Sequence, residues 1–480
     1  MEELTRQNAL DVYAKKFTLG EKRLFGRESE LPLVYISKDW FGEAARFPDV
    51  ESVFARLAED GFTPNVDPST KHIVGVTGNV AGYDVTVTTD FGACTLEVAF
   101  APTSSLQESA MQTNAVMGML ADYFLAKDIA ILGYGIQPLT APDRSLLPIK
   151  GRAATLESRF YTQERLNGHN TDVHFHTINA SEQIHVDVSA AEAIPVLNAL
   201  TKITPYLHAL FANSAVWKGH PDELYLEPRE KFWDWVVNIP QDTFRKGLPH
   251  FFSSLDMYLA TILEFEPVMT VRTVEGTNQY LEFFGTRSFR EYLEKGRSQV
   301  IVPGSKKNPK LVAGVGEEIS PAVLDLLVHE SFVWFANRLK SVYGTIELRS
   351  FAQQPFDAAH APEALVRGLL HNKEEFLSYV RSLPGMTVLK LRKDREAILR
   401  EGFGARIDQL NMPAHLGELL RIAEDGLRRG GEDPAYLDPL QQRLRDRTNP
   451  STQAKQLWEQ GGIEKIIKER ALHEHLRRGR

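Results

Sequence analysis

The sequence has one cysteine, Cys94, among its 480 residues, so no disulfide can form within the chain. Scarcity of cysteine is typical of proteins in reducing compartments, and we expect a cytoplasmic protein with Cys94 as a buried structural thiol. The sequence also lacks an apolar run of about 20 residues, the length that a membrane span needs. Its most apolar stretch, 194–217, is interrupted by Lys202 and His208. The acidic N-terminus has no apolar signal core.

Positive charge is not in excess either: 55 Lys and Arg stand against 63 Asp and Glu, a net charge of −8. This balance argues against nucleic acid or an anionic membrane as a partner. The phosphate loop GxxxxGK[ST], the nucleophile elbow GxSxG and the zinc motif HExxH are absent, and the Gly133-Tyr134-Gly135 segment lacks the third glycine of a dinucleotide-binding fingerprint. We expect small-molecule substrates as partners, and a monomer or homodimer.

The hydrophobic pattern predicts helices and short strands that do not alternate regularly. Helical periodicity is clearest at 51–59, 105–127, 190–213, 321–343, 361–381 and 392–480. Strands are predicted at 27–35, 74–76, 83–89, 94–100, 129–132, 173–188, 268–274 and 345–351. Such an order favours an α+β fold, with an antiparallel or mixed sheet and helices packed on one side. We expect a catalytic domain at 1–385, a helical C-terminal subdomain at 386–480, and mobile loops at 142–152 and 304–310.

Polar side chains recur at every second residue of four predicted strands. They are Glu28 and Glu30; Glu97; Gln183, His185 and Asp187; and Glu347 and Arg349. Residues two apart on a strand project from the same face, and acidic residues are poor strand formers. One alternative is an ordinary solvated sheet face. However, nearly all these side chains offer oxygen or nitrogen ligands, so we interpret them as one polar face that binds a divalent cation.

Carboxylates and oxygen ligands suit Mg²⁺, which proteins usually share with nucleotide phosphates. Cationic side chains must then hold the phosphoryl oxygens. The candidates are Lys150, Arg152, Arg229 and Arg349. The alternative interpretation of each is an ordinary surface cation exposed to solvent. A second metal hypothesis places Asp172, His174 and His176 on one strand face, a spacing able to bind zinc or iron. A polar strand face without metal is the competing interpretation of that segment.

Several segments match, in order, the motifs of a known family. They are GRESE (26–30), FGACTLEVAFAP (91–102), LGYGIQP (132–138), PIKGR (148–152), QIHVD (183–187), LFANSAVWKG (210–219) with Arg229 and Trp233 after it, and IELR (346–349). Over roughly 21–380 the chain resembles the glutamate–cysteine ligase family of plants and many bacteria, and the related bacterial carboxylate–amine ligases. The ordered set is fairly specific, although each motif alone is weak.

The resemblance implies a glutamine synthetase-like fold: a curved, mainly antiparallel sheet with a polar, funnel-like active-site face. It implies an ATP-dependent ligase of glutathione biosynthesis that joins the γ-carboxylate of glutamate to an amine through an acyl phosphate. The implied cofactors are Mg²⁺ and ATP. By family position, the metal ligands are Glu28, Glu30, Glu97, Gln183 and Glu347; the nucleotide-binding residues are Lys150, Arg152, His185 and Asp187; the catalytic residues are Arg349, Lys150 and Arg152; and the substrate-binding residues are Arg229 and Trp233.

Two departures bear on the amine acceptor. His185 stands where the plant-type family has asparagine, and SFAQQP follows Arg349 in place of the plant-type GAD. Both features resemble the other carboxylate–amine ligases. Cysteine is therefore the first candidate acceptor and a different amine the second. A catalytically silent binding protein on the same fold is a third hypothesis. With one cysteine, the intramolecular redox switch of the plant relatives is impossible here.

Overall fold

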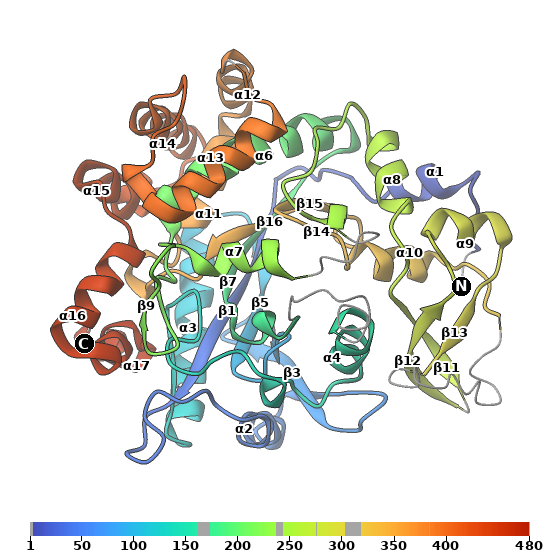
Figure 1. Cartoon of the computed structure of the whole chain (residues 1–480), viewed down its shortest axis with the longest axis horizontal. Coiled ribbons are helices and arrows are strands. Elements are labelled where there is room, and N and C mark those ends of the chain that lie inside the picture. The colour runs from blue at the N-terminus through green and yellow to red at the C-terminus, as the bar shows by residue number, and fades with distance from the viewer. Residues whose placement is uncertain are drawn as a thin grey trace.

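A curved nine-stranded sheet lies at the centre of the computed structural model (Figure 1). The structure describes residues 3–161, 173–236, 243–274, 276–302, 318–383 and 385–479. The strands follow the order β15-β16-β7-β1-β5-β4-β3-β2, with β6 paired to β1, and every pair in this sheet is antiparallel. The predicted mainly antiparallel α+β fold is confirmed.

The bounds of these strands agree closely with several sequence predictions. They are β1 (Phe25–Tyr35), β2 (Thr63–Val66), β3 (Ile73–Val80), β4 (Tyr83–Thr89), β5 (Thr95–Thr103), β6 (Ile129–Ile131), β7 (Ser181–Asp187), β15 (Asn337–Lys340) and β16 (Thr345–Ala352). In β1, β5, β7 and β16, apolar side chains alternate with the polar ones. This alternation gives the sheet an apolar face that helices cover and a polar face that stays open.

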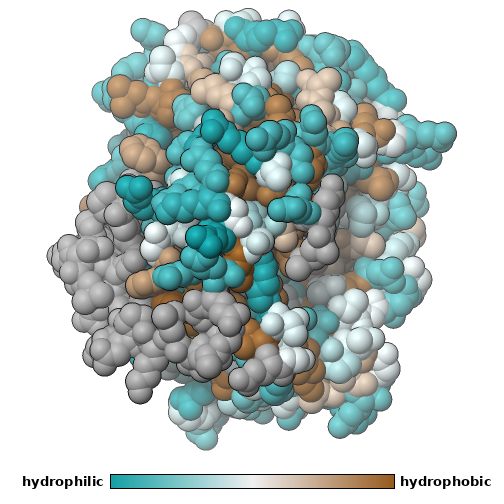
Figure 2. All heavy atoms as spheres, turned by 90° about the vertical axis from the view of Figure 1, so that its right-hand side faces the viewer, coloured by the Kyte–Doolittle hydropathy of each residue, from teal (hydrophilic) through white to brown (hydrophobic). Residues whose placement is uncertain are grey.

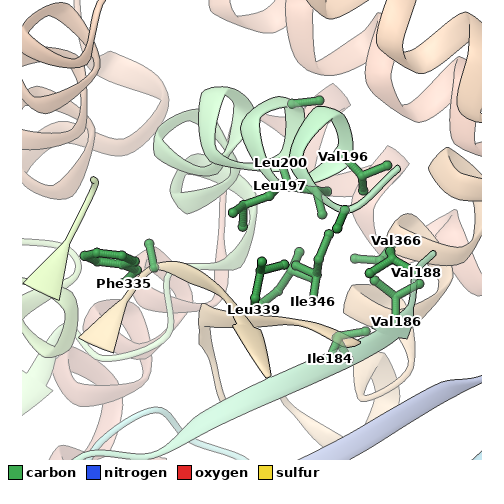
Figure 3. Packing of buried hydrophobic residues seen from close by; sticks show 14 of the residues in the cluster. Ile184, Val186, Val188, Val196, Leu197, Leu200, Phe335, Leu339, Ile346 and Val366 are labelled. Carbon is green, nitrogen blue, oxygen red and sulfur yellow. The ribbon is translucent and has the colours of Figure 1, made fainter. Parts of the chain in front are cut away.

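Four helices cover the apolar face. Helices α2 (Phe47–Glu59) and α3 (Leu106–Leu125) pack on the half formed by β1, β3, β4 and β5. Helices α6 (Ala190–Phe211) and α11 (Ala361–His371) cover the half formed by β7, β15 and β16. Figure 3 shows Val196, Leu197 and Leu200 of α6 directed toward Leu339 and Ile346 of the strands. This close packing fixes the strands whose opposite face carries the polar residues.

Further helices pack around this core. The C-terminal ones are α12 (Lys373–Ser382), α13 (Val388–Glu401), α14 (Met412–Arg429), α15 (Asp438–Asp446), α16 (Pro450–Arg470) and α17 (Leu472–Arg478). Helix α13 contacts α6, and α14 contacts both α6 and α11, while α17 contacts α3 and β6. The C-terminal residues thus lie against the main sheet and its helices, but the division at residues 385 and 386 stays a prediction.

A second, small sheet lies at the right of Figure 1. It consists of β11 (Met269–Val274), β12 (Thr277–Phe284) and β13 (Gln299–Ile301), with α1 (Ala9–Ala14), α8 (Leu255–Leu263), α9 (Phe289–Lys295) and α10 (Val323–Glu330) nearby. Shorter elements are α4 (Gly151–Leu156), α7 (Pro228–Trp235), the hairpin β8 (Val216–Trp217) with β9 (His220–Pro221), and the parallel pair β10 (Lys246–Gly247) with β14 (Trp334–Phe335).

Two predicted elements are wrong in part. The helix expected at 321–343 ends at Glu330, and the residues after it form β14 and β15 because they pair with β10 and β16. The strand expected at 173–188 is a 3-10 helix at Val173–Ile178, and only Ser181–Asp187 is extended. Most of the loop expected at 142–152 is irregular, although it contains a 3-10 turn at Arg144–Leu146 and the start of α4. The loop expected at 304–310 lies outside the described residues.

Charged residues also occupy part of the sheet face that the helices cover. Arg27 Nε donates to Glu182 Oε1 at 2.7 Å, and Ser29 Oγ donates to Glu182 Oε2 at 2.7 Å. Glu363 of α11 lies 3.8 Å from Arg27 and accepts a hydrogen bond from Arg367 at 2.8 Å. All five side chains are buried. Arg27, Ser29 and Glu182 therefore form a buried ionic network, with Glu363 and Arg367, directly behind the polar face.

The molecular surface in Figure 2 is mostly hydrophilic, and its hydrophobic atoms form small, interrupted patches. Among the described residues, no helix combines the length and the apolar composition that crossing a membrane would require.

Candidate active site

A cavity of about 530 Å³ opens on the polar face of the main sheet. Strands β1, β5, β7, β15 and β16 contribute to its lining, together with α4, α7 and the turn after β4. Ten of the twelve predicted site residues line it: Glu28, Glu30, Glu97, Lys150, Arg152, Gln183, Arg229, Trp233, Glu347 and Arg349. The strand register explains this convergence, because Glu30 is paired with Glu97, Glu28 with Gln183, and Glu347 with His185.

One group of possible metal ligands comprises Glu28, His185 and Glu347, whose ligand atoms lie within 4.8 Å of one another. His185 Nε2 lies 3.3 Å from Glu28 Oε1, and His185 Nδ1 lies 3.1 Å from Thr345 Oγ1. Burial raises the pKa of Glu28, but its interaction with His185 outweighs burial and the pKa is lowered. His185, expected at the nucleotide, thus lies in a carboxylate cluster.

Glu347 is held by cations on both sides. Arg338 of β15 donates to it through Nε at 2.6 Å and Nη2 at 3.0 Å, and Arg349 donates through Nη1 at 2.5 Å. Burial raises the pKa of Glu347, but Arg338, Arg349 and Lys340 together hold it well below its usual range. The carboxylate therefore remains ionised and able to bind a cation.

A second group of possible ligands comprises Glu30, Asp90 and Glu97, again within 4.8 Å of one another. Burial raises the pKa of Glu30 to about 7, with the Asp90 charge adding to the effect. Burial also raises the pKa of Glu97 well above its usual range, and the charges of Asp90, Glu28 and Glu30 raise it further. Three acidic groups this close repel one another when ionised.

Glu30 is oriented by three hydrogen bonds on one side of this cluster. Its Oε2 accepts from the backbone N and the Oγ of Ser181 at 2.8 and 2.6 Å, and its Oε1 accepts from Gln183 Nε2 at 2.5 Å. Gln183 Oε1 in turn accepts from Arg349 Nη1 at 3.1 Å. The amide of Gln183 therefore connects the acidic cluster to the cationic side of the cavity.

The acidic clusters fit a divalent metal ion. Carboxylate and imidazole donors converge in groups of three, and Mg²⁺ prefers oxygen ligands. Burial, together with the neighbouring carboxylate charges, raises the pKa values of Glu30 and Glu97 and so disfavours their ionised forms. A bound cation would supply positive charge and favour the ionised carboxylates.

Cationic side chains stand around the same cavity. Lys150 precedes α4, and its ammonium donates to Thr88 Oγ1 at 2.9 Å and to the backbone oxygen of Thr89. Burial lowers the pKa of Lys150 to about 8, although Glu97 and Asp90 oppose this effect. Lys150 and Arg349 are not solvated surface cations, whereas Arg152 is exposed and its guanidinium lies 5.3 Å from the centre of the Phe332 ring.

Arg229 and Trp233 lie on α7 at another side of the cavity. Arg229 is buried, which excludes the surface alternative. Its Nη2 donates to the backbone oxygen of Arg349 at 3.2 Å, but its Nε has no acceptor among the described residues. Trp233 packs on His176 with ring centres 4.3 Å apart. A buried guanidinium with a free N–H suits a substrate carboxylate.

Two predicted features differ in the structure from what the sequence indicated. Asp187 is not among the described residues that line the cavity; its Oδ2 accepts from the backbone N of Leu24 at 3.2 Å and it lies at the end of β7. His174 and His176 lie on a 3-10 helix, not on a strand face; His176 lines the cavity, and His174 Nε2 lies 3.0 Å from Glu157 Oε1. Neither histidine belongs to a possible metal cluster within the described segments, and Asp172 lies outside them.

The sequence analysis missed four charged residues that line the cavity: Asp67, Asp90, Arg338 and Lys340. Arg338 and Lys340 line it from β15, which the sequence pattern predicted to be helical. Burial lowers the pKa of Lys340 to about 8. Asp90 follows the last residue of β4, where no period-two pattern marks it. Asp90 stands directly before Phe91-Gly92, where a recognised family motif begins, and this position is the signal by which the sequence analysis could have found it.

Comparisons with known proteins concern the fold and the family. No protein of curated function matches the sequence significantly. The structure is similar to glutamate–cysteine ligase of Francisella tularensis in complex with AMP, with a TM-score of 0.53 and 14% identity over 94% of this chain and 88% of that one. A bifunctional glutathione synthetase from Pasteurella multocida gives a TM-score of 0.49 and 13% identity, over 99% of this chain and 54% of that longer one.

At these identities the structural likeness concerns the fold alone. The model of one protein family, glutamate–cysteine ligase family 2, matches residues 51–472. This match spans most of the chain, from α2 to the first residue of α17, and includes Glu97, Lys150, Arg229 and Glu347. The chain belongs to glutamate–cysteine ligase family 2 and is an ATP-dependent ligase.

Proposed function

We propose that the protein forms an amide between the γ-carboxylate of glutamate and an amine, through an acyl phosphate, with cysteine as the first candidate amine. The observation that carries this proposal is the shared cavity, whose lining combines two acidic clusters with six cationic side chains: Lys150, Arg152, Arg229, Arg338, Lys340 and Arg349. A site that activates a carboxylate with ATP needs both, because it must hold metal-bound phosphates and neutralise charge on the transferred phosphoryl group.

Each set of residues has a role in this proposal. Glu28, His185 and Glu347 would hold one Mg²⁺, and Glu30, Asp90 and Glu97 would hold another, with Gln183 beside them. Bound metal ions would supply positive charge that offsets the charge of the phosphates. This donor set replaces the predicted one of five residues: it adds His185 and Asp90, and it gives Gln183 the role of orienting Glu30.

The cationic residues position the reactants. Lys150, Arg152 and Arg349 hold phosphoryl oxygens, so that the substrate carboxylate attacks the γ-phosphorus and ADP leaves with little reorganisation of the site. Arg229 pairs with a carboxylate of an amino-acid substrate, and Trp233 borders the same region. The amine then attacks the acyl carbon and phosphate leaves. Asp187 lies outside the cavity lining, so we give it no role in nucleotide binding.

A different amine acceptor is the second candidate. It is favoured by His185, which occupies a ligand cluster at the position where plant-type enzymes have asparagine. The decisive experiment incubates the protein with glutamate, ATP and Mg²⁺ and a panel of amines that includes cysteine, and measures ADP release and product mass. Cysteine-dependent ADP release with formation of a γ-glutamyl amide supports the first candidate. ADP release with other amines only supports the second, and no glutamate-dependent release with any amine contradicts the proposal.

A further inference from the structure

A second cavity, of about 310 Å³, lies between the segment that follows β16 and the C-terminal helices α16 and α17. It shares no lining residue with the main cavity among the described residues. Its polar lining includes Asp357, Glu469, Arg470, Arg478 and three glutamines of α16: Gln453, Gln456 and Gln460. Because the glutamines are three and four residues apart, they share one face of the helix. The proposed function leaves this cavity unused.

Arg470 is the buried charge of the second cavity, with 7% of its surface exposed. Its Nη2 makes long contacts of 3.3 Å with Pro450 O and 3.5 Å with Gln453 Oε1, and its Nε has no acceptor among the described residues. It forms no ion pair within the described chain. Buried charges are normally paired, because removing them from water is costly. Arg470 therefore has capacity for an anionic partner.

The surroundings of Arg470 add positive charge. Arg443 is also buried and donates only to Leu210 O at 3.1 Å and Gln354 Oε1 at 2.8 Å, again without an ion pair within the described chain. Burial lowers the pKa of Arg443 to about 9, against the charge of Asp357. Asp357 is exposed at the cavity and is the carboxylate that acts on both arginines.

The charges that line the second cavity favour a zwitterion as its ligand over a simple anion. Arg478 and Glu469 pair with each other at 2.7 Å, which leaves Arg470 and Asp357 as the opposite charges available to a ligand. A phosphate dianion would meet Asp357 and Glu469 as well as Arg470. We propose that this cavity binds a free α-amino acid, with the carboxylate on Arg470 and the ammonium on Asp357, and that binding is communicated to β16.

Short covalent and hydrogen-bonded connections link this cavity to the main one. Pro355 and Asp357 line it only a few residues after Arg349, which β16 presents to the main cavity. Gln354, bonded to Arg443, donates to Ala352 O at 2.7 Å at the end of β16. An amino acid that draws Asp357 toward Arg470 thus acts on the segment that anchors β16.

The test is hydrogen exchange on the full chain with each standard L-amino acid in turn, and with inorganic phosphate as the probe for a simple anion. We expect at least one amino acid to slow exchange at 355–358 and 453–470, and to change exchange at 345–352. Phosphate should not do so. Protection by no amino acid, or equal protection by phosphate, overturns the proposal. Protection at the cavity without any change at 345–352 refutes the coupling to β16.

Two variants separate this cavity from other binding sites. Gln456→Trp places a bulky ring in the cavity from an exposed helix position, so the fold should persist. Asp357→Asn removes the ammonium partner and should weaken binding about 10-fold or more. Glu459→Gln, exposed on the same helix but outside the cavity lining, is the control and should bind normally. Protection that persists in Gln456→Trp, or unchanged affinity in Asp357→Asn, overturns the assignment. Neither readout depends on ligase turnover.

Discussion

Replacing Glu97 with glutamine should stabilise the metal-free protein while it abolishes most of the activity. Glu97 shares a cluster with Glu30 and Asp90, with ligand atoms within 4.8 Å. At that distance two unit charges repel by about 3 kcal/mol at an effective dielectric constant of about 20. Part of this repulsion is avoided by protonation, so we expect Glu97→Gln to raise the free energy of unfolding by ~1–3 kcal/mol. Glutamine keeps the shape, and Glu97 has no hydrogen bond within the described chain that would be lost.

The gain should depend on pH in a defined direction. A carboxyl group whose pKa is raised on folding binds its proton more tightly in the folded state, so its contribution to stability falls as the pH rises toward the folded pKa. The pKa of Glu97 is raised by burial and by neighbouring charges. The stability difference between Glu97→Gln and the wild type should therefore be small below the usual glutamate pKa of 4.5 and grow as the pH rises.

The assay combines thermal unfolding with and without Mg²⁺ and ATP-dependent ADP release. Turnover should fall by about 100-fold or more, because the lost carboxylate is a ligand of a phosphate-bridging metal in our proposal. Mg²⁺ should stabilise the wild type more than the variant. Asp84→Asn, which removes an exposed carboxylate on β4, is the matched control and should change neither property. Wild-type turnover at saturating Mg²⁺, or destabilisation of the metal-free variant, would refute the reasoning.

Other predictions address the remaining parts of the site. Arg229→Lys should lower kcat/KM for one amino-acid substrate by ~10–150-fold with little change in the KM of ATP, because a hydrogen bond to a charged group is lost. The measurement is steady-state kinetics in which each substrate is varied in turn. A change in the KM of ATP alone would contradict this prediction. Exchange at 142–152 should slow when a nonhydrolysable ATP analogue binds with Mg²⁺, and unchanged exchange with confirmed binding counts against a phosphate clamp. Mg²⁺ affinity, measured by calorimetry, should weaken as the pH falls below about 7, because the pKa of Glu30 is raised to that value and its carboxylate must ionise to bind the metal. An affinity that does not depend on pH would contradict the assignment of Glu30 as a metal ligand. Arg27→Met should cost ~3–5 kcal/mol in unfolding experiments, because it leaves the buried carboxylate of Glu182 without an ion-pair partner, and a neutral effect would show that the network adds no stability.

The strands of the site could be predicted because their polar residues break the usual composition of strands. Glu28 and Glu30, for example, occupy alternate positions of β1 and point into the cavity, as the period of two requires. Glu97 and Glu347 follow the same logic on β5 and β16. The register that brings them together comes from long-range pairing, which the sequence pattern does not contain.

The sequence pattern failed where tertiary contacts decide the local structure. Apolar residues at 321–343 recur at a helical period, yet Arg338 and Lys340 lie on a strand because β15 pairs with β16. The histidines at 174 and 176 alternate like strand residues but lie on a 3-10 helix. The role of Arg27 could not be predicted either. Polar residues occupy both faces of β1 here, Arg27 and Ser29 on one and Glu28 and Glu30 on the other, and the sequence does not reveal which face is solvated.

The buried ionic network behind the sheet restricts how the strands can pair during folding. If β1 slipped by one residue against β7, Glu28 and Glu30 would turn toward the helices, and Arg27 would turn into the cavity. Glu182 would then be buried without its arginine, a loss of ~3–5 kcal/mol for a broken buried pair, while Glu363 would keep only Arg367. The misaligned state would thus bury carboxylates with no counterion on one face and lose its metal ligands on the other. Charges that never contact a substrate therefore select the alignment on which the cavity depends.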